Sequence, residues 1–137
     1  MPTPPAHFDD VTVQEAMAWF EERTLACEGP EQPFPDPREW RCTHEFEDGS
    51  RLEARITGDR DGVIQLVGLA VGLNSEDAAS FLGSTVAILA VPDGDAEALT
   101  QWAFNHQETG GQRVFGQASV SLQPHSDERA VVVQAMP

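Results

Sequence analysis

Hydrophobic positions recur with a helical period near the N-terminus. The residues that would share one face of an α-helix are Val13, Ala16, Met17, Phe20, Thr24 and Cys27. Thr12 and Glu15 have the spacing of a capping box, which satisfies unpaired backbone N–H groups at the start of a helix. Gly29 and Pro30 would stop it. The pattern therefore predicts a helix that starts after Thr12 and runs to about Cys27.

Prolines interrupt the pattern on both sides of this helix. Residues 1–11 carry three prolines in their first five positions, so we expect a flexible tail with nothing to bury. Residues 29–39 carry four prolines and no period, which predicts an extended connector. Phe34, in the middle of this connector, must either pack under the protein or stay exposed to a partner.

From residue 40 the period changes to two, as expected for a β-strand. Trp40, Cys42, His44 and Phe46 would share one face of it. Asp48-Gly49 is a hairpin signal, and polar and apolar residues alternate again over 51–56. Residues 63–73 are almost all apolar, which indicates a strand buried on both faces. The pattern predicts a three-stranded antiparallel meander over residues 40–73.

The motif GDRDG, residues 58–62, joins the last two of these strands and raises the question of a cation. Asp59, Asp61 and Gly62 match the start of a calcium loop, but the residues that follow are apolar and offer no further oxygen ligands. Glycine and aspartate also favour tight turns, because glycine permits positive φ and aspartate bonds to nearby backbone. We therefore predict a turn here and no calcium site.

The sequence pattern of residues 74–91 is compatible with both a helix and a strand. Asn74 or Ser75 would cap a short helix. The helical spacing continues to Leu89, but Gly83 is a natural helix stop and residues 84–91 favour a strand. We favour a helix to Leu82 followed by a strand over 84–91, with one longer helix as the alternative.

The last part of the chain predicts one more helix and a hairpin. Asp93 or Asp95 would begin the helix, whose inner face carries Leu99, Trp102, Ala103 and His106. Strands at about 113–122 and 129–136 would follow. The whole pattern predicts a single α+β domain over residues 1–137, with a mainly antiparallel sheet packed against helices. The element order over about two-thirds of the chain resembles the small folds of secretion chaperones and related sensory regulators, which implies a fold-level analogy only.

The charge of the chain excludes several classes of function. The 137 residues include 23 acidic and 8 cationic side chains, for a net charge of −15, and lysine does not occur. Phosphate backbones would be repelled, so we expect no direct nucleic-acid binding. A basic helix on a membrane surface is excluded too. An acidic mimic of nucleic acid, which would inhibit a DNA-binding partner, stays open as an alternative.

The N-terminal residues and the cysteines give expectations about the cellular compartment of the protein. Residues 1–10 lack the positive and apolar regions of a secretory signal, and no apolar run is long enough to span a bilayer. Cys27 and Cys42 are too few for a disulfide scaffold, so we expect both to stay thiols in a reducing compartment. These observations predict a soluble, cytoplasmic protein without a membrane partner.

Only weak candidates exist for chemistry. Cys42 and His44 would share a strand face and Cys27 could approach them, which would give three zinc ligands or a nucleophile with its base. Trp40 and Phe46 flank the pair, as in a packed core, and free cysteine is usually buried. His106 would lie on the apolar face of its helix near the C-terminal end. We expect structural roles for all of them, with no metal, no cofactor and no catalytic residue.

The terminal hairpin has the most informative surface. Residues 114–122 and 130–136 carry no charge, although exposed strands usually carry charges that discourage edge pairing. One face of the hairpin's first strand would carry Val114, Ala118, Val120 and Leu122. Besides Phe34, the residues predicted for partner binding form the other, polar face, which consists of Phe115, Gln117, Ser119 and Ser121. We expect this hairpin to be covered by a helix of the same chain or by a second subunit. The leading hypothesis is a non-catalytic binding or regulatory module that acts through protein contacts, with a homodimer as one form of it. The rival is a ligand-binding protein or enzyme with a pocket lined by Cys42 and His44.

Overall fold

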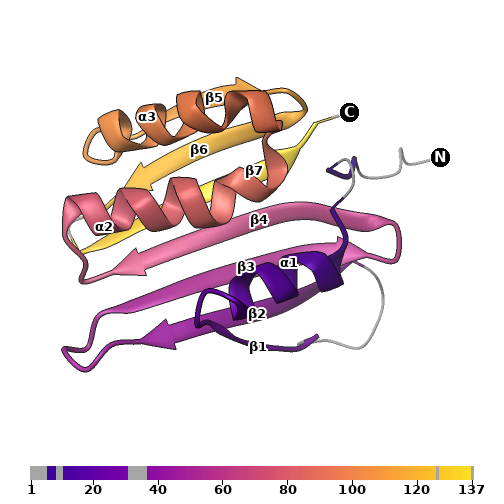
Figure 1. Cartoon of the computed structure of the whole chain (residues 1–137), viewed down its shortest axis with the longest axis horizontal. Coiled ribbons are helices and arrows are strands. Elements are labelled where there is room, and N and C mark those ends of the chain that lie inside the picture. Colours follow the sequence, from indigo (N-terminus) through magenta and orange to yellow (C-terminus); the bar gives the residue numbers. More distant parts are fainter. Residues whose placement is uncertain (1–5, 9–10, 31–36, 126, 137) are drawn as a thin grey trace.

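The computed structural model describes residues 6–8, 11–30, 37–125 and 127–136. Seven antiparallel strands form one sheet in the order β1-β2-β3-β4-β7-β6-β5 (Figure 1). The strands are β1 (Ala26–Glu28), β2 (Arg38–Glu45), β3 (Arg51–Asp59), β4 (Gly62–Val71), β5 (Gly111–Phe115), β6 (Ala118–Pro124) and β7 (Glu128–Ala135). The helical segments are α1 (Val13–Glu21), α2 (Ser75–Ala79), η1 (Ser80–Val86), η2 (Ala87–Ala90), η3 (Asp93–Asp95) and α3 (Ala96–His106). The predicted α+β class and its antiparallel sheet with packed helices are confirmed.

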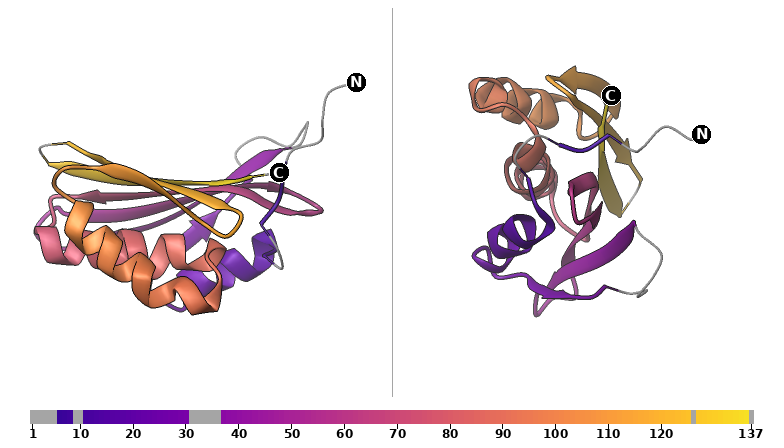
Figure 2. Two further views of the ribbon diagram at one scale, coloured as in Figure 1. Left: turned by 90° about the horizontal axis from the view of Figure 1, so that it is seen from above. Right: turned by 90° about the vertical axis from the view of Figure 1, so that its right-hand side faces the viewer.

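All the helices lie on one face of the sheet. Figure 2 shows α1, the α2–η2 region and α3 as one layer beneath the strands, with no helix of the described chain on the other side. The core fills the space between the two layers. Its fully buried side chains include Phe20, Ile56, Leu66, Leu82, Leu99 and Val131. The other face of the sheet is therefore left for solvent or a partner.

Helix α1 begins as predicted but ends earlier. The Thr12 side chain accepts a hydrogen bond from the Glu15 backbone N–H at 3.1 Å, which confirms the predicted cap. The helix ends at Glu21 because Thr24 adopts a left-handed conformation, with φ of 70°. The Leu25 N–H then bonds to the Phe20 carbonyl at 3.1 Å, a Schellman-type ending. The predicted extension of the helix to residue 27 is wrong, and residues 26–28 form the edge strand β1.

The strand predicted over residues 84–91 is wrong, and its alternative is right. Residues 75–90 are helical throughout, as α2, η1 and η2 in succession. Gly83 does not stop the helix but allows another helix to approach, because a Cβ at Gly83 would lie 2.9 Å from Cβ of Ala103 on α3. Val86 and Ala87 are fully buried. Their burial explains the apolar run that sequence patterns assign to a strand.

Part of the predicted tail is packed against the sheet. The Phe8 N–H donates to the Val63 carbonyl at 2.9 Å, and the Val63 N–H donates to the Val11 carbonyl at 3.0 Å. Phe8 is 4% exposed and belongs to the core. The expectation that residues 1–11 have nothing to bury is therefore wrong at Phe8.

The C-terminal region contains three strands where two were predicted. The segment predicted as one strand over 113–122 holds the β5–β6 hairpin, with Phe115 opposite Ala118 and only two residues between them. Gly116 opens this loop with φ of 60°, as type II′ turns require at that position. Because the chain reverses at this turn, Phe115 faces the core and Val114 faces away from it, which is the opposite of the prediction.

Candidate functional site

The uncovered side of the sheet is the most extended candidate surface, and strand register defines it. One row across the sheet consists of Arg55, Val67, Val132, Ser121 and Gln112, each opposite the next on neighbouring strands. Because side chains alternate along a strand, these residues face away from the fully buried neighbours Ile56, Leu66 and Val131. We call this surface the open face.

Two further rows complete the open face. Beside the first row lie Glu53, Leu69, Ala130 and Gln123, and on its other side lie Thr57, Gln65, Gln134, Ser119 and Val114. The middle of the face is apolar, since Val67, Leu69 and Val132 are only partly exposed and Ala130 is buried. Val114 extends it onto the edge strand and is 51% exposed. The centre of the open face therefore carries no charged side chain.

Uncharged polar side chains flank this apolar centre on β4, β5, β6 and β7. The Gln65 side-chain amide donates to Oε1 of Gln134 at 3.0 Å, and the Gln112 amide donates to Oγ of Ser119 at 2.8 Å. Both bonds join neighbouring strands across the open face. Such groups can form hydrogen bonds to a partner without the desolvation cost of a charge.

Within the three rows of the open face, charge lies only on β3, at Glu53 and Arg55. The same side of the sheet carries further acids outside these rows, at Glu39 and Glu45 on β2 and at Glu128 on β7. Glu53 is 5% exposed, and its carboxylate lies 2.8 Å from Nε of Arg55 and 3.5 Å from Nε of Arg41. The two guanidinium groups balance the buried carboxylate, which would otherwise be costly to desolvate. The carboxylate of Glu53 therefore adds no unpaired negative charge to the three central rows.

The structure divides the residues predicted for partner binding. Ser119 and Ser121 lie on the open face, partly exposed. Phe115 does not, because it is 3% exposed in the core, with its ring 6.0 Å from that of Trp102. Gln117 is exposed in the β5–β6 turn, and Phe34 lies outside the described residues. Val114 lies on the open face, although the sequence pattern placed it on the apolar face of the hairpin. Gly116, which forms the turn, was the sequence signal that could have shown its position.

The predicted pair of free thiols is wrong. Cys27 on β1 and Cys42 on β2 are directly opposite each other and form a disulfide. Neither sulfur can act as a thiolate ligand or nucleophile in this state, so the candidate zinc site with His44 and the candidate catalytic thiol both fail. The sequence argument for a reducing compartment fails with them. Sequence reasoning missed the pairing because it placed Cys27 on a helix.

The candidate histidines lie far apart. His44 is on β2 with its ring edge-on to Phe46, at 4.6 Å between centroids, and Phe46 is 40% exposed beyond the strand end. His106 is on α3, where Nδ1 lies 2.9 Å from the Trp102 carbonyl and the ring stacks on Trp102. Figure 1 places β2 and α3 toward opposite edges of the sheet. They do not form one site with Cys42.

A cleft of about 390 Å³ lies between the end of α1, the β2–β3 hairpin and the α2–η1 region. Its lining includes Arg23, Phe46, Asp48, Leu73 and Phe81, and includes neither Cys42 nor His44. Hydrogen bonds from the Ser50 hydroxyl and the Ser50 N–H lower the pKa of Asp48. These bonds close the hairpin turn, so the ionised carboxylate has a structural role.

The turn predicted at GDRDG is confirmed, and it has a neighbour that the sequence did not indicate. Oδ1 of Asp59 accepts a hydrogen bond from the Asp61 N–H at 2.8 Å, which closes the turn between β3 and β4. The same oxygen lies 2.9 Å from Nε2 of His7. Only the fold brings His7 to this turn, and no spacing in the sequence could have shown it.

No helix in the described part of the chain is both long and apolar enough to cross a membrane. Comparison of the whole chain with protein-family models, with curated proteins and with solved structures finds no significant match.

Proposed function

We propose that this protein is a non-catalytic binding module that acts through the open face, and that a second copy of the chain is the occupant. The observation that carries the proposal is the charge-free centre of this face on a chain of net charge −15. Partly exposed Val67, Leu69 and Val132 form an apolar patch there, with polar side chains around it. Apolar centres with polar rims are typical of protein interfaces.

Electrostatics favours this face for contact between identical chains. Two copies that each carry a charge of −15 repel one another, and the repulsion is strongest where carboxylates meet. On the open face the buried acid, Glu53, is already balanced by Arg41 and Arg55. A two-fold stacking of open faces would therefore bring apolar and amide groups together without opposing carboxylates at its centre.

The size of the face is at the lower end of what a stable dimer needs. From β3 to β5 it spans five strands, or about 24 Å, and about six residues along each strand, or about 20 Å. That is roughly 480 Å² of planar area per copy, and the accessible area of a surface with protruding side chains is larger. Stable interfaces bury about 1,200–2,000 Å² in total. We therefore expect a dimer that is in equilibrium with monomer at low concentration.

Charge substitutions on the open face test the proposal. Ser119→Arg and Val132→Arg each place a charge on the face, and each lowers the net negative charge, so general repulsion cannot explain a loss of association. An unpaired charge buried in an interface costs several kcal/mol. Light scattering at tens of micromolar should therefore show monomers for both variants, with native circular dichroism.

Gln101→Arg is the matched control, because it adds the same charge on α3 in the helical layer. This variant should associate like the unmodified chain. Self-association that survives both open-face substitutions would show that the surface is wrong. A chain that is monomeric without any substitution would reject a second copy as the occupant.

These observations do not support the two alternative functions considered from the sequence, a ligand-binding protein or enzyme and a nucleic-acid mimic. A pocket lined by Cys42 and His44 would need a free thiol, and Cys42 is disulfide-bonded and fully buried. A nucleic-acid mimic would need an acidic recognition surface, and the open face is uncharged at its centre. The cytoplasmic location stays a proposal that depends on the oxidation state of this cysteine pair.

A further inference from the structure

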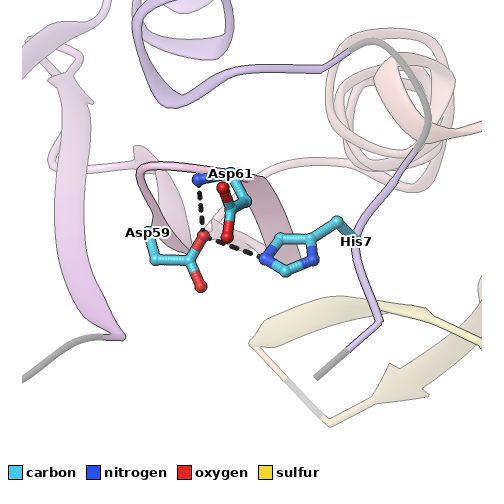
Figure 3. A group of neighbouring side chains, drawn as sticks. All are labelled: His7, Asp59 and Asp61. Carbon is cyan, nitrogen blue, oxygen red and sulfur yellow. Dashed lines mark hydrogen bonds and ion pairs between the residues drawn. The ribbon is translucent and has the colours of Figure 1, made fainter. Parts of the chain in front are cut away.

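An imidazole and two carboxylates meet at the β3–β4 turn (Figure 3). Nε2 of His7 lies 2.9 Å from Oδ1 of Asp59, and one possible ligand atom from each of His7, Asp59 and Asp61 lies within 4.8 Å of the others. His7 and Asp59 are 52 residues apart in the sequence. None of the three residues belongs to the open face, so this cluster has no role in the proposed association.

The backbone fixes the position of His7. The next residue, Phe8, is buried in the core and donates its N–H to the Val63 carbonyl at 2.9 Å. The ring of His7 also packs close to Gly62, where an added Cβ would lie 3.8 Å from Cβ and Cδ2 of His7. The imidazole is therefore presented to the turn by a packed segment of chain and not by a free end.

The charges of the cluster are not balanced by the surrounding protein. The side-chain carboxylate of Asp61 makes no hydrogen bond or ion pair among the described residues, and Figure 3 shows it directed toward Asp59 and His7. Arg60, between the two acids, makes no ion pair with either of them within the described chain. Two carboxylates at this separation repel each other. A cation bound among the three groups would remove this imbalance.

We propose that His7, Asp59 and Asp61 bind a divalent first-row transition metal, for which zinc is the representative ion. Imidazole nitrogen favours such metals, whereas calcium prefers a shell of six to eight oxygens that this cluster does not offer. Zinc bonds of about 2.0–2.2 Å place neighbouring ligand atoms roughly 3.0–3.5 Å apart. Nε2 of His7 and Oδ1 of Asp59, at 2.9 Å, need to separate only slightly to reach this spacing, and rotation of the exposed Asp61 side chain would complete the set.

Metal binding would replace the hydrogen bond between His7 and Asp59. A neutral imidazole would carry its proton on Nδ1 instead of Nε2, and an imidazolium would release its Nε2 proton to solvent, so that in either case Nε2 of His7 and Oδ1 of Asp59 are free to act as ligands. The three protein ligands leave a further position for water. The ion would link the chain before α1 to the turn between β3 and β4, which are otherwise joined by the backbone hydrogen bonds of Phe8 and Val63.

Titration of the whole protein with zinc chloride tests the site. We expect one saturable zinc per chain, and Asp61→Asn should weaken its binding at least about tenfold. This substitution removes a ligand but keeps the turn, because only the backbone N–H of Asp61 takes part in it. Asp93→Asn, which removes the same charge at an exposed position elsewhere, should bind zinc like the unmodified chain. Calcium chloride should show no comparable binding.

Hydrogen exchange gives an independent measurement. Zinc should slow exchange of the Phe8 and Val63 amides in the unmodified chain and not in the Asp61→Asn variant. Absence of saturable zinc binding, or equal affinity in the Asp61→Asn and Asp93→Asn variants, would overturn the proposal. His7→Gln serves as a second variant, because its side chain lies outside the sheet, and unchanged zinc affinity in this variant would overturn the proposal equally.

Discussion

Replacing Gly68 by alanine should destabilise the protein, because the helical layer sits directly on this glycine. A Cβ at Gly68 would lie 2.8 Å from Cγ2 of Val86, 3.1 Å from Cγ1 of Val131 and 3.2 Å from Cδ2 of Leu82. All three neighbours are at most 1% exposed, so none can move outward. Overpacking of this kind costs about 1–3 kcal/mol. Alanine recovers about 0.5–1 kcal/mol, since glycine is unfavourable within a strand. The midpoints of these two ranges give an expected net loss in the free energy of unfolding of about 1 kcal/mol.

Urea denaturation followed by tryptophan fluorescence measures this loss, and a double-mutant cycle assigns it. Val86→Ala removes the nearest methyl, so the two substitutions together should cost less than the sum of their separate effects, with a coupling of about 1 kcal/mol. Gly94→Ala is the control, because a Cβ there would meet nothing within 4 Å, and its effect should stay within about 0.5 kcal/mol. The packing of residues 80–86 as a helix over β4 would be refuted if Gly68→Ala left the free energy of unfolding unchanged. It would also be refuted if the effects of Gly68→Ala and Val86→Ala on that free energy were strictly additive.

Three further predictions concern single features of the fold. Thr24→Gly should raise the free energy of unfolding by about 1 kcal/mol in urea denaturation, since threonine is strained at positive φ; no gain would count against this helix ending. Reduction of the Cys27–Cys42 disulfide should lower stability by about 3 kcal/mol for a 15-residue separation, and rapid alkylation of both cysteines without reductant would show that the bond is absent. The lowered pKa of Asp48 stabilises the fold above the ordinary carboxyl pKa, and this contribution is lost as pH falls through the lowered value. Asp48→Asn should therefore flatten the acid side of the melting-temperature profile, and an unchanged profile would contradict the role of the Ser50 bonds.

Local patterns predicted the elements whose residues interact mainly with near neighbours. The helix cap at Thr12, the alternation through β2 and β3 and the turn at Asp59 all appear where the sequence places them. Of the predicted capping box, the bond from the Glu15 N–H to Thr12 forms, and the Glu15 carboxylate accepts from the Thr12 hydroxyl in place of the Thr12 backbone N–H. These features depend on backbone geometry and on contacts within a few residues. Such signals are readable without knowledge of the fold.

Glycines show why local signals failed elsewhere. Gly83 was interpreted as a helix stop, but it lies within a helix where α3 comes too close for a side chain. Gly116 was interpreted as part of a strand, but it opens the β5–β6 turn. The residue type is the same in each case, and tertiary contacts decide its use.

The candidate sites depended on contacts that are distant in sequence. The period of two showed which residues share a face of β6, but not which face the helices would leave uncovered. The disulfide required Cys27 to lie on a strand beside β2, which followed from the unexpected ending of α1. His7 reaches Asp59 only because Phe8 is anchored beside Val63. Each of these outcomes is set by packing and not by spacing along the chain.

The native mass of the unmodified protein decides whether the open face is an interface between copies. Sedimentation equilibrium over a range from below one to tens of micromolar would measure it at several ionic strengths. We predict a concentration-dependent rise from the 14.9 kDa chain mass to twice that value, with stronger association at higher salt because screening reduces repulsion between the acidic copies. A mass of 14.9 kDa at every concentration and salt would contradict the proposal.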